Sequence, residues 1–341
     1  MKRKLSFFGQ IYFVGIIIIG AGVTSFVTDQ NLPLINLISA SSQEGSISSN
    51  EFTLSDSNSK FVSIDKVDLK KVIVGDIEIG FKTFGIGEPI LLISGSGNVM
   101  DVWPLHFLNE LANGHEVTIF DNRGVGNTTE GTKPFSVKQL ADDSIGLMNA
   151  LGIQQADVLG FSMGSFVAQQ LAITSPERVN KLILYGASCG GQEGIPQSSK
   201  VINAISDFVN NRTIDESAFL EVTFPQKWMR ENPNFLELIP KTSETILSTT
   251  VKKQFEINED WLSTNWSGVC NLLQKVNIPS LIITGTEDEA IPSKNSLILA
   301  DKIPGSWLVQ IKDAGHGLMY QYPETFTDIV KTFLNVTGTT K

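Results

Sequence analysis

The chain has 341 residues and ordinary apolar content, enough for one large domain with an insertion. Its formal net charge of −10 argues against nucleic-acid binding, because the phosphate backbone would repel an acidic protein. The two cysteines, Cys189 and Cys270, form no C-x-x-C pair, which argues against a thiolate metal site or a dithiol redox site. A disulfide between them is compatible with the sequence, but we expect them to be unconnected.

The N-terminal segment, residues 1–28, has the composition of a membrane-targeting sequence. Basic residues at positions 2–4 precede 24 uncharged positions, Leu5 to Thr28. As a helix this run would extend roughly 36 Å, enough to cross a bilayer. The sequence predicts a signal peptide or, because the run is long and no A-x-A site follows it directly, an uncleaved transmembrane anchor. The leading basic residues predict that the rest of the chain is extracytoplasmic, either membrane-anchored or secreted.

Residues 29–65 are expected to be a flexible linker, since nine of the 22 residues from Ser39 to Lys60 are serine. Beyond them, short apolar runs alternate with helical patterns, which indicates a mostly parallel sheet covered by helices on both faces. Strands are predicted at 67–74, 76–85, 89–95, 116–124, 156–162, 181–187, 279–288 and 306–311. Helices are predicted at 101–114, 136–152, 293–303 and 323–334, and from Met163 onward.

This alternation stops at residues 188–275, which we interpret as a helical cap between two core segments, 66–187 and 276–341. The segment is rich in aromatic residues, among them Trp228, Trp261, Trp266, Phe208, Phe219, Phe224 and Phe235. These side chains are expected to form either the apolar roof of a pocket or the core of the cap itself. No internal repeat is apparent.

A serine between two glycines marks the candidate nucleophile. Residues 160–164 read GFSMG, a G-x-S-x-G pattern that follows a predicted strand and opens a predicted helix. In that context Ser162 occupies a strained turn, and the flanking glycines let strand and helix pass closely. The free N–H groups at the start of the helix would stabilise negative charge that develops beside the serine.

A serine hydroxyl is a weak nucleophile and needs a base. Of the three histidines, His106 falls in a predicted helix and His115 begins a strand, whereas His316 follows the last strand, where catalytic groups collect in α/β sheets. We therefore predict His316 as the base. Asp288, after another buried strand, is predicted to orient His316, with Glu287 as the alternative.

Two backbone N–H groups are predicted to form an oxyanion hole, those of Met163 and of Ser96 in the loop Ser94–Gly97. Each donor would contribute on the order of 3 kcal/mol to stabilising a tetrahedral intermediate. No cluster of ligand-type residues and no glycine-rich phosphate loop is apparent, so we expect neither a metal nor an organic cofactor.

Together, the motifs SGSG, DNRGVG, GFSMGS, GTEDEAIP and GHGL occur in an order that resembles the α/β-hydrolase superfamily, over about Val67 to Phe333. The order Ser, Asp, His along the chain is also that of this superfamily. The resemblance implies a sheet of about eight strands with a helical cap after the sixth. It implies a structural role for the Asp121–Gly124 turn. The chain departs from the family in having Ser94-Gly95 where His-Gly is frequent, which alters the hydrogen bonds around the oxyanion residue.

The resemblance is closest to the esterase, perhydrolase and C–C hydrolase branch, and implies a serine hydrolase acting on a small, apolar ester through an acyl-enzyme. A perhydrolase, a C–C bond hydrolase and a receptor that binds its ligand without turnover stay open as alternatives. Dehalogenase and epoxide hydrolase chemistry are disfavoured, because those relatives use an aspartate where this chain has Ser162. The expected partner is a small-molecule substrate, with a membrane link through the N-terminal segment; the sequence leaves the oligomeric state open.

Overall fold

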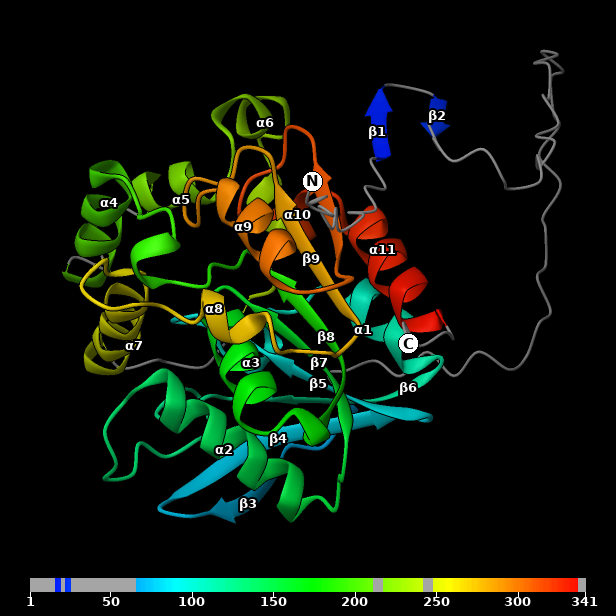
Figure 1. The fold of residues 1–341 in the computed structure, drawn as a ribbon, viewed down its shortest axis with the longest axis vertical. Coiled ribbons are helices and arrows are strands. Elements are labelled where there is room, and N and C mark those ends of the chain that lie inside the picture. The colour runs from blue at the N-terminus through cyan, green and yellow to red at the C-terminus, as the bar shows by residue number, and fades with distance from the viewer. Residues whose placement is uncertain (1–15, 20–21, 26–65, 211–216, 242–247, 337–341) are drawn as a thin grey trace, which may run out of the picture.

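The computed structural model describes residues 16–19, 22–25, 66–210, 217–241 and 248–336 (Figure 1). Its centre is an eight-stranded sheet in the order β10-β9-β8-β7-β5-β6-β4-β3. The strands are β3 (Lys70–Val74), β4 (Ile77–Gly85), β5 (Glu88–Ile93), β6 (His115–Phe120), β7 (Ala156–Phe161), β8 (Val179–Tyr185), β9 (Ser280–Gly285) and β10 (Trp307–Ile311). Strand β4 is antiparallel to both of its neighbours, β3 and β6. All the other pairs of neighbouring strands in this sheet are parallel. The mostly parallel α/β sheet predicted from the sequence is confirmed.

Helices cover both faces of this sheet, because the central strands are apolar on both sides. Every residue of β7 and β9 is buried. On one face lie α2 (Val137–Ala150), α3 (Met163–Thr174) and α9 (Lys294–Lys302), and on the other α1 (Leu105–Ala112) and α11 (Pro323–Asn335) (Figure 1). The loops that are predicted to carry the functional residues follow the carboxyl ends of the parallel strands. These helices leave that edge of the sheet uncovered.

Between β8 and β9 the chain leaves the sheet and forms a group of helices (Figure 1). They are α4 (Ser199–Asn210), α5 (Ser217–Thr223), α6 (Gln226–Glu231), α7 (Ser248–Leu262) and α8 (Cys270–Leu273). We use the name cap for residues 188–275, where the alternating pattern of the sequence stops. The exact limits of the cap and of the two core segments stay a prediction.

A disulfide between Cys189 and Cys270 joins the two ends of the cap, so the expectation of two unconnected cysteines is wrong. The Cα atoms of the two residues are 5.0 Å apart, and both side chains are buried. The main chain also holds them together, since Val269 N–H donates to the Cys189 carbonyl at 2.9 Å. The residues are 81 positions apart, and only the path of the cap brings them together.

The predicted N-terminal helix is not supported where the structure describes this segment. Residues Ile16–Ile19 (β1) and Gly22–Ser25 (β2) form an antiparallel pair of short strands. Four consecutive isoleucines are β-branched, which favours an extended chain over a helix. The rest of the predicted span, and the linker up to residue 65, lie outside the described residues. Among the residues that are described, no helix is both long and apolar enough to cross a membrane.

Candidate active site

Ser162 lies on a sharp turn between β7 and α3, as the GFSMG pattern predicted. Its backbone angles are φ 54° and ψ −121°, a strained conformation for a residue with a side chain. The glycines on either side make this turn sterically feasible. A Cβ on Gly160 would collide with the main chain of Gly164, and a Cβ on Gly164 would collide with that of Ile93 on β5. Strain of this kind persists only where the surrounding structure enforces it, and it concentrates at functional sites.

The structure brings Asp288 and His316 together from two different loops. His316 Nδ1 lies 2.8 Å from Asp288 Oδ2, and both residues are buried. The second carboxylate oxygen, Oδ1, accepts a hydrogen bond from Ile291 N–H at 2.8 Å, which fixes the carboxylate. The neighbouring Glu287 and Glu289 are exposed, and Glu289 pairs with Lys200 at 2.7 Å. The contact with His316 thus belongs to Asp288 and not to the alternative, Glu287.

Tyr185, the last residue of β8, holds the His316 loop in place. Its hydroxyl donates to the His316 carbonyl, and it accepts a hydrogen bond from Met319 N–H at 3.3 Å. Burial raises the pKa of Tyr185 well above its usual value, so the hydroxyl keeps its proton and remains a donor. The ring of Phe161 packs against the His316 ring, with centroids 5.0 Å apart. These contacts fix both the main chain and the ring of His316.

The loop Ser94–Gly97 lies directly beside Ser162. A Cβ on Gly95 would lie only 3.0 Å from Ser162 Cβ, so a glycine lets the loop approach this closely. Ser94 stands where the family often has histidine. Its carbonyl and its hydroxyl each accept a hydrogen bond from Asn122 Nδ2 at 3.2 Å. The backbone roles of Ser96 and Met163 stay predictions, but both residues flank the nucleophile position.

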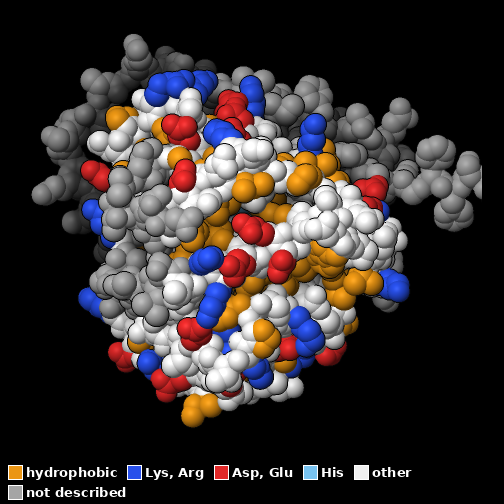
Figure 2. All heavy atoms as spheres, turned by 90° about the vertical axis from the view of Figure 1, so that its left-hand side faces the viewer, with side chains coloured by type: hydrophobic (Ala, Val, Ile, Leu, Met, Phe, Trp, Pro, Cys, Tyr) orange, Lys and Arg blue, Asp and Glu red, His pale blue; other side chains and the backbone are white. Residues whose placement is uncertain are grey.

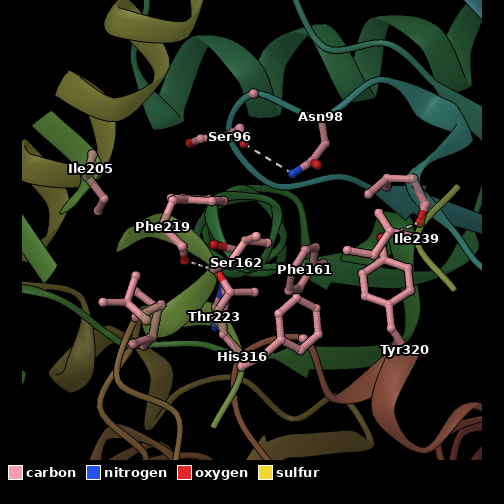
Figure 3. A pocket seen from close by; sticks show the side chains of 18 of the residues that line it. Ser96, Asn98, Phe161, Ser162, Ile205, Phe219, Thr223, Ile239, His316 and Tyr320 are labelled. Atoms are coloured by element: carbon pink, nitrogen blue, oxygen red, sulfur yellow. Dashed lines mark hydrogen bonds between the residues drawn. The ribbon is translucent and has the colours of Figure 1, made fainter. Parts of the chain in front are cut away.

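Ser162 and His316 border one cavity of about 200 Å³ between the sheet and the cap. Its floor comes from the sheet end, and much of its lining comes from apolar cap residues such as Ile205, Phe219 and Ile239. In Figure 3, Ile205 and Phe219 lie on one side of Ser162, and Ile239 and Tyr320 lie on the other. The site therefore offers apolar room on both sides of the serine. Figure 2 shows the cap side of the molecule, with hydrophobic side chains gathered around its middle and charged ones among them.

The other histidines do not contribute to this site. His106 lies in α1, and His115, at the start of β6, has its Nε2 atom 3.8 Å from Asp157 Oδ2. The Asp121–Gly124 turn holds a buried arginine, Arg123, whose ionic contacts belong to the scaffold. Within the described ranges, no group of three or more His, Cys, Asp or Glu side chains is arranged to hold a metal ion.

Tyr185 and Gln254 contact the site but were not singled out from the sequence. Tyr185 is the last residue of an apolar strand, at the carboxyl edge of the sheet, and this position in the sequence could have marked it as a candidate site residue. Gln254 lies on cap helix α7, 157 positions from the loop that it contacts. No local pattern marks such a contact.

Comparison with known proteins agrees with the fold. The model of the α/β-hydrolase fold family matches residues 88–323. A putative carbamate hydrolase from Azorhizobium caulinodans is 24% identical, over 76% of this chain and 96% of its own length. A putative non-heme bromoperoxidase from Mycobacterium tuberculosis is 28% identical, over 76% of this chain and 99% of its own. The solved structure of a thermophilic esterase from Thermogutta terrifontis matches with a TM-score of 0.62 and 25% identity, covering 78% of this chain and 98% of the esterase.

Proposed function

The chain belongs to the α/β-hydrolase family, and from this premise we propose that it is a serine hydrolase that cleaves small, apolar esters through an acyl-enzyme. The observation that carries the proposal is the 2.8 Å contact of Asp288 with His316, which borders the same cavity as a strained Ser162. A scaffold has no need of this combination. Backbone strain and a buried carboxylate–imidazole pair both cost stability, and such features cluster at functional sites.

In the proposed reaction, Ser162 Oγ attacks the ester carbonyl carbon while His316 Nε2 accepts the hydroxyl proton. Nδ1 is the nitrogen that contacts Asp288, so Nε2 is the one free to act as the base. The N–H groups of Met163 and Ser96 would stabilise the oxyanion. Collapse of the intermediate releases the alcohol, which takes the proton from His316. Water then attacks the acyl-enzyme by the same route, yielding the carboxylic acid and free Ser162.

The apolar cavity supports an ester with hydrocarbon groups on both sides of the scissile bond. Its volume of about 200 Å³ has room for a small ester. A perhydrolase or a C–C bond hydrolase would use the same three residues, and a receptor would bind its ligand without turnover. The strained Ser162 favours an enzyme over a receptor, because binding alone needs no activated nucleophile.

We also propose that the catalytic part of the chain works outside the cytoplasm, linked to the membrane or released. Two observations support this location. Basic residues precede the long uncharged N-terminal run, and the Cys189–Cys270 disulfide is typical of an oxidising compartment. Protease added to intact cells should digest the enzyme. Resistance until the cells are lysed, with the purified protein itself protease-sensitive, would contradict the location.

The function is tested by hydrolysis of 4-nitrophenyl esters from acetate to decanoate. We expect turnover of the short and medium chains, and we expect Ser162→Ala to lower kcat by about 10⁶ because the nucleophile is lost. Ser175→Ala, at the far end of the same helix, is the matched control and should keep full activity. A Ser162→Ala protein with most of the wild-type activity would refute the assignment. Ester binding without turnover by the wild type would favour a receptor.

A further inference from the structure

Gln254 is a buried polar residue that reaches from the cap to the loop beside Ser162. It lies on α7, and its side chain is fully buried. Its Oε1 atom accepts a hydrogen bond from Gly97 N–H at 2.8 Å. Its main-chain carbonyl accepts a second bond, from the Ser96 hydroxyl, at 3.3 Å. One cap residue therefore binds two successive residues of the predicted oxyanion loop.

The peptide unit between Ser96 and Gly97 is consequently held at both ends. Its N–H, which belongs to Gly97, is bound by Gln254. Its carbonyl oxygen, which belongs to Ser96, accepts from Asn98 Nδ2 at 3.1 Å, the dashed contact in Figure 3. Because a peptide unit is planar, holding both poles fixes the orientation of this plane. The N–H of Ser96 belongs to the preceding peptide unit, which is joined to this plane at the Ser96 Cα. Together with the hydrogen bond of the Ser96 hydroxyl to Gln254, the fixed plane restricts the rotations of Ser96 that set the direction of its N–H.

This loop packs directly against the cap. Gly97 has φ +70°, in the left-handed region, and α7 packs over it, so that a Cβ there would lie 3.6 Å from Val251 Cγ1. The Ser96 hydroxyl also lies 3.2 Å from the sulfur of Met163, the residue that carries the other predicted oxyanion donor. The cap, the loop and the start of α3 are thereby linked at one point.

A buried glutamine lowers stability unless its side-chain amide forms hydrogen bonds. A buried amide costs free energy when any of its groups lacks a hydrogen bond. Within the part of the chain that the structure describes, Gln254 Nε2 has no partner, while Oε1 is bound to the loop. A leucine or methionine would fill the same space without the unpaired Nε2, but it would leave Gly97 N–H without its acceptor. The accepting oxygen is thus the feature that distinguishes glutamine at this position.

We propose that Gln254 is a positioning residue, through which cap helix α7 holds the Ser96–Gly97 peptide so that Ser96 N–H points at the substrate oxyanion. The inference rests on the proposed serine hydrolase function. It makes the cap part of the catalytic machinery as well as a wall of the pocket. Loss of the side-chain oxygen should weaken transition-state binding more than substrate binding.

The test compares Gln254→Met with Thr250→Val in the full chain. Methionine keeps the size of glutamine but cannot accept from Gly97. We expect kcat for 4-nitrophenyl butyrate to fall about 30-fold with KM within about twofold, since a whole oxyanion donor is worth 10²–10³. Affinity for butylboronic acid, whose adduct on serine mimics the tetrahedral intermediate, should fall by a similar factor. Thr250, one turn earlier on α7, is also buried, with a hydroxyl that has no partner in the described ranges, and Thr250→Val should change neither quantity.

A second variant, Gln254→Leu, covers the case in which Gln254→Met does not fold. Asn98→Ala releases the other end of the same peptide, and it should also weaken boronic acid binding more than it raises KM. If a folded Gln254→Met or Gln254→Leu protein keeps wild-type kcat and boronic acid affinity, the role of Gln254 is overturned while the proposed function stands. A wild-type chain that hydrolyses no ester would overturn the function and this inference with it.

Discussion

Two buried groups of hydrogen-bonded titratable side chains in this molecule have similar contact distances and differ in what surrounds them. Arg123 binds Asp143 at 2.7 and 2.8 Å and Asp76 at 2.9 and 3.0 Å, and its guanidinium is wholly enclosed. His316 binds Asp288 at 2.8 Å, but its ring borders a cavity that also holds Ser162. The first cluster satisfies its charges within the scaffold. The second presents a reactive ring to a ligand, and this difference, rather than burial or distance, separates a structural cluster from a candidate catalytic one.

The comparison predicts that Asp288→Asn impairs activity far more than stability. An amide in place of the carboxylate cannot stabilise the imidazolium or hold the same ring tautomer, so kcat for 4-nitrophenyl butyrate should fall about 10⁴-fold. The matched control is Glu287→Gln on the exposed adjacent residue, which should keep its activity. Equal losses in the two variants, or a larger loss in Glu287→Gln, would contradict the role given to Asp288.

The opposite pattern is predicted for Arg123→Met. Removing the guanidinium leaves Asp143 and Asp76 without their cation, which should lower the free energy of unfolding by about 3–5 kcal/mol. Urea titration followed by circular dichroism measures this. Lys138→Met is the control, because Lys138 and Asp142 form an exposed i,i+4 pair on α2, the helix that also carries Asp143. The control should cost no more than about 0.5 kcal/mol. Similar losses in both variants would remove the distinction between a buried cluster and a surface pair.

The smallest expected effect concerns pH. The hydrogen bond from Arg123 holds the pKa of Asp76 far below its ordinary value of 3.8, aided by the N–H groups of Thr132 and Lys133. A carboxylate with a depressed pKa in the folded state contributes stability above its unfolded pKa, and this contribution is lost as the pH falls below it. The difference in unfolding free energy between wild type and Asp76→Asn should therefore stay the same from pH 7 to about pH 4 and shrink progressively as the pH falls from 4 towards 2. A difference that stays constant down to about pH 2 would contradict the pKa assignment.

The elements that could be predicted from the sequence are those encoded by short-range patterns. The buried strands β7 and β9 appear as apolar runs, and the turn at Ser162 is encoded by Gly160 and Gly164, which sterics require there. Placing His316 and Asp288 needed only the rule that such residues follow strands at the carboxyl edge of the sheet. The structure shows the contact that was expected between these two side chains.

Features that depend on the path of the cap could not be predicted in this way. The Cys189–Cys270 disulfide and the contact of Gln254 with Gly97 join residues 81 and 157 positions apart. Each depends on where α7 and the cap ends return to the core, which is decided by packing over the whole domain. The N-terminal strands show a different limit. Hydrophobicity suggested a helix, whereas β-branching at Ile16–Ile19 favours the strand that the structure describes.

The central claim is that Ser162 is a nucleophile activated by His316 and Asp288. It is tested most directly by treating the full chain with a fluorophosphonate and locating the adduct by mass spectrometry of its peptides. We predict a single phosphonyl adduct on Ser162 in the wild type, much slower labelling of Asp288→Asn and none of Ser162→Ala. An unlabelled wild-type protein, or an adduct on a different serine, would contradict the claim.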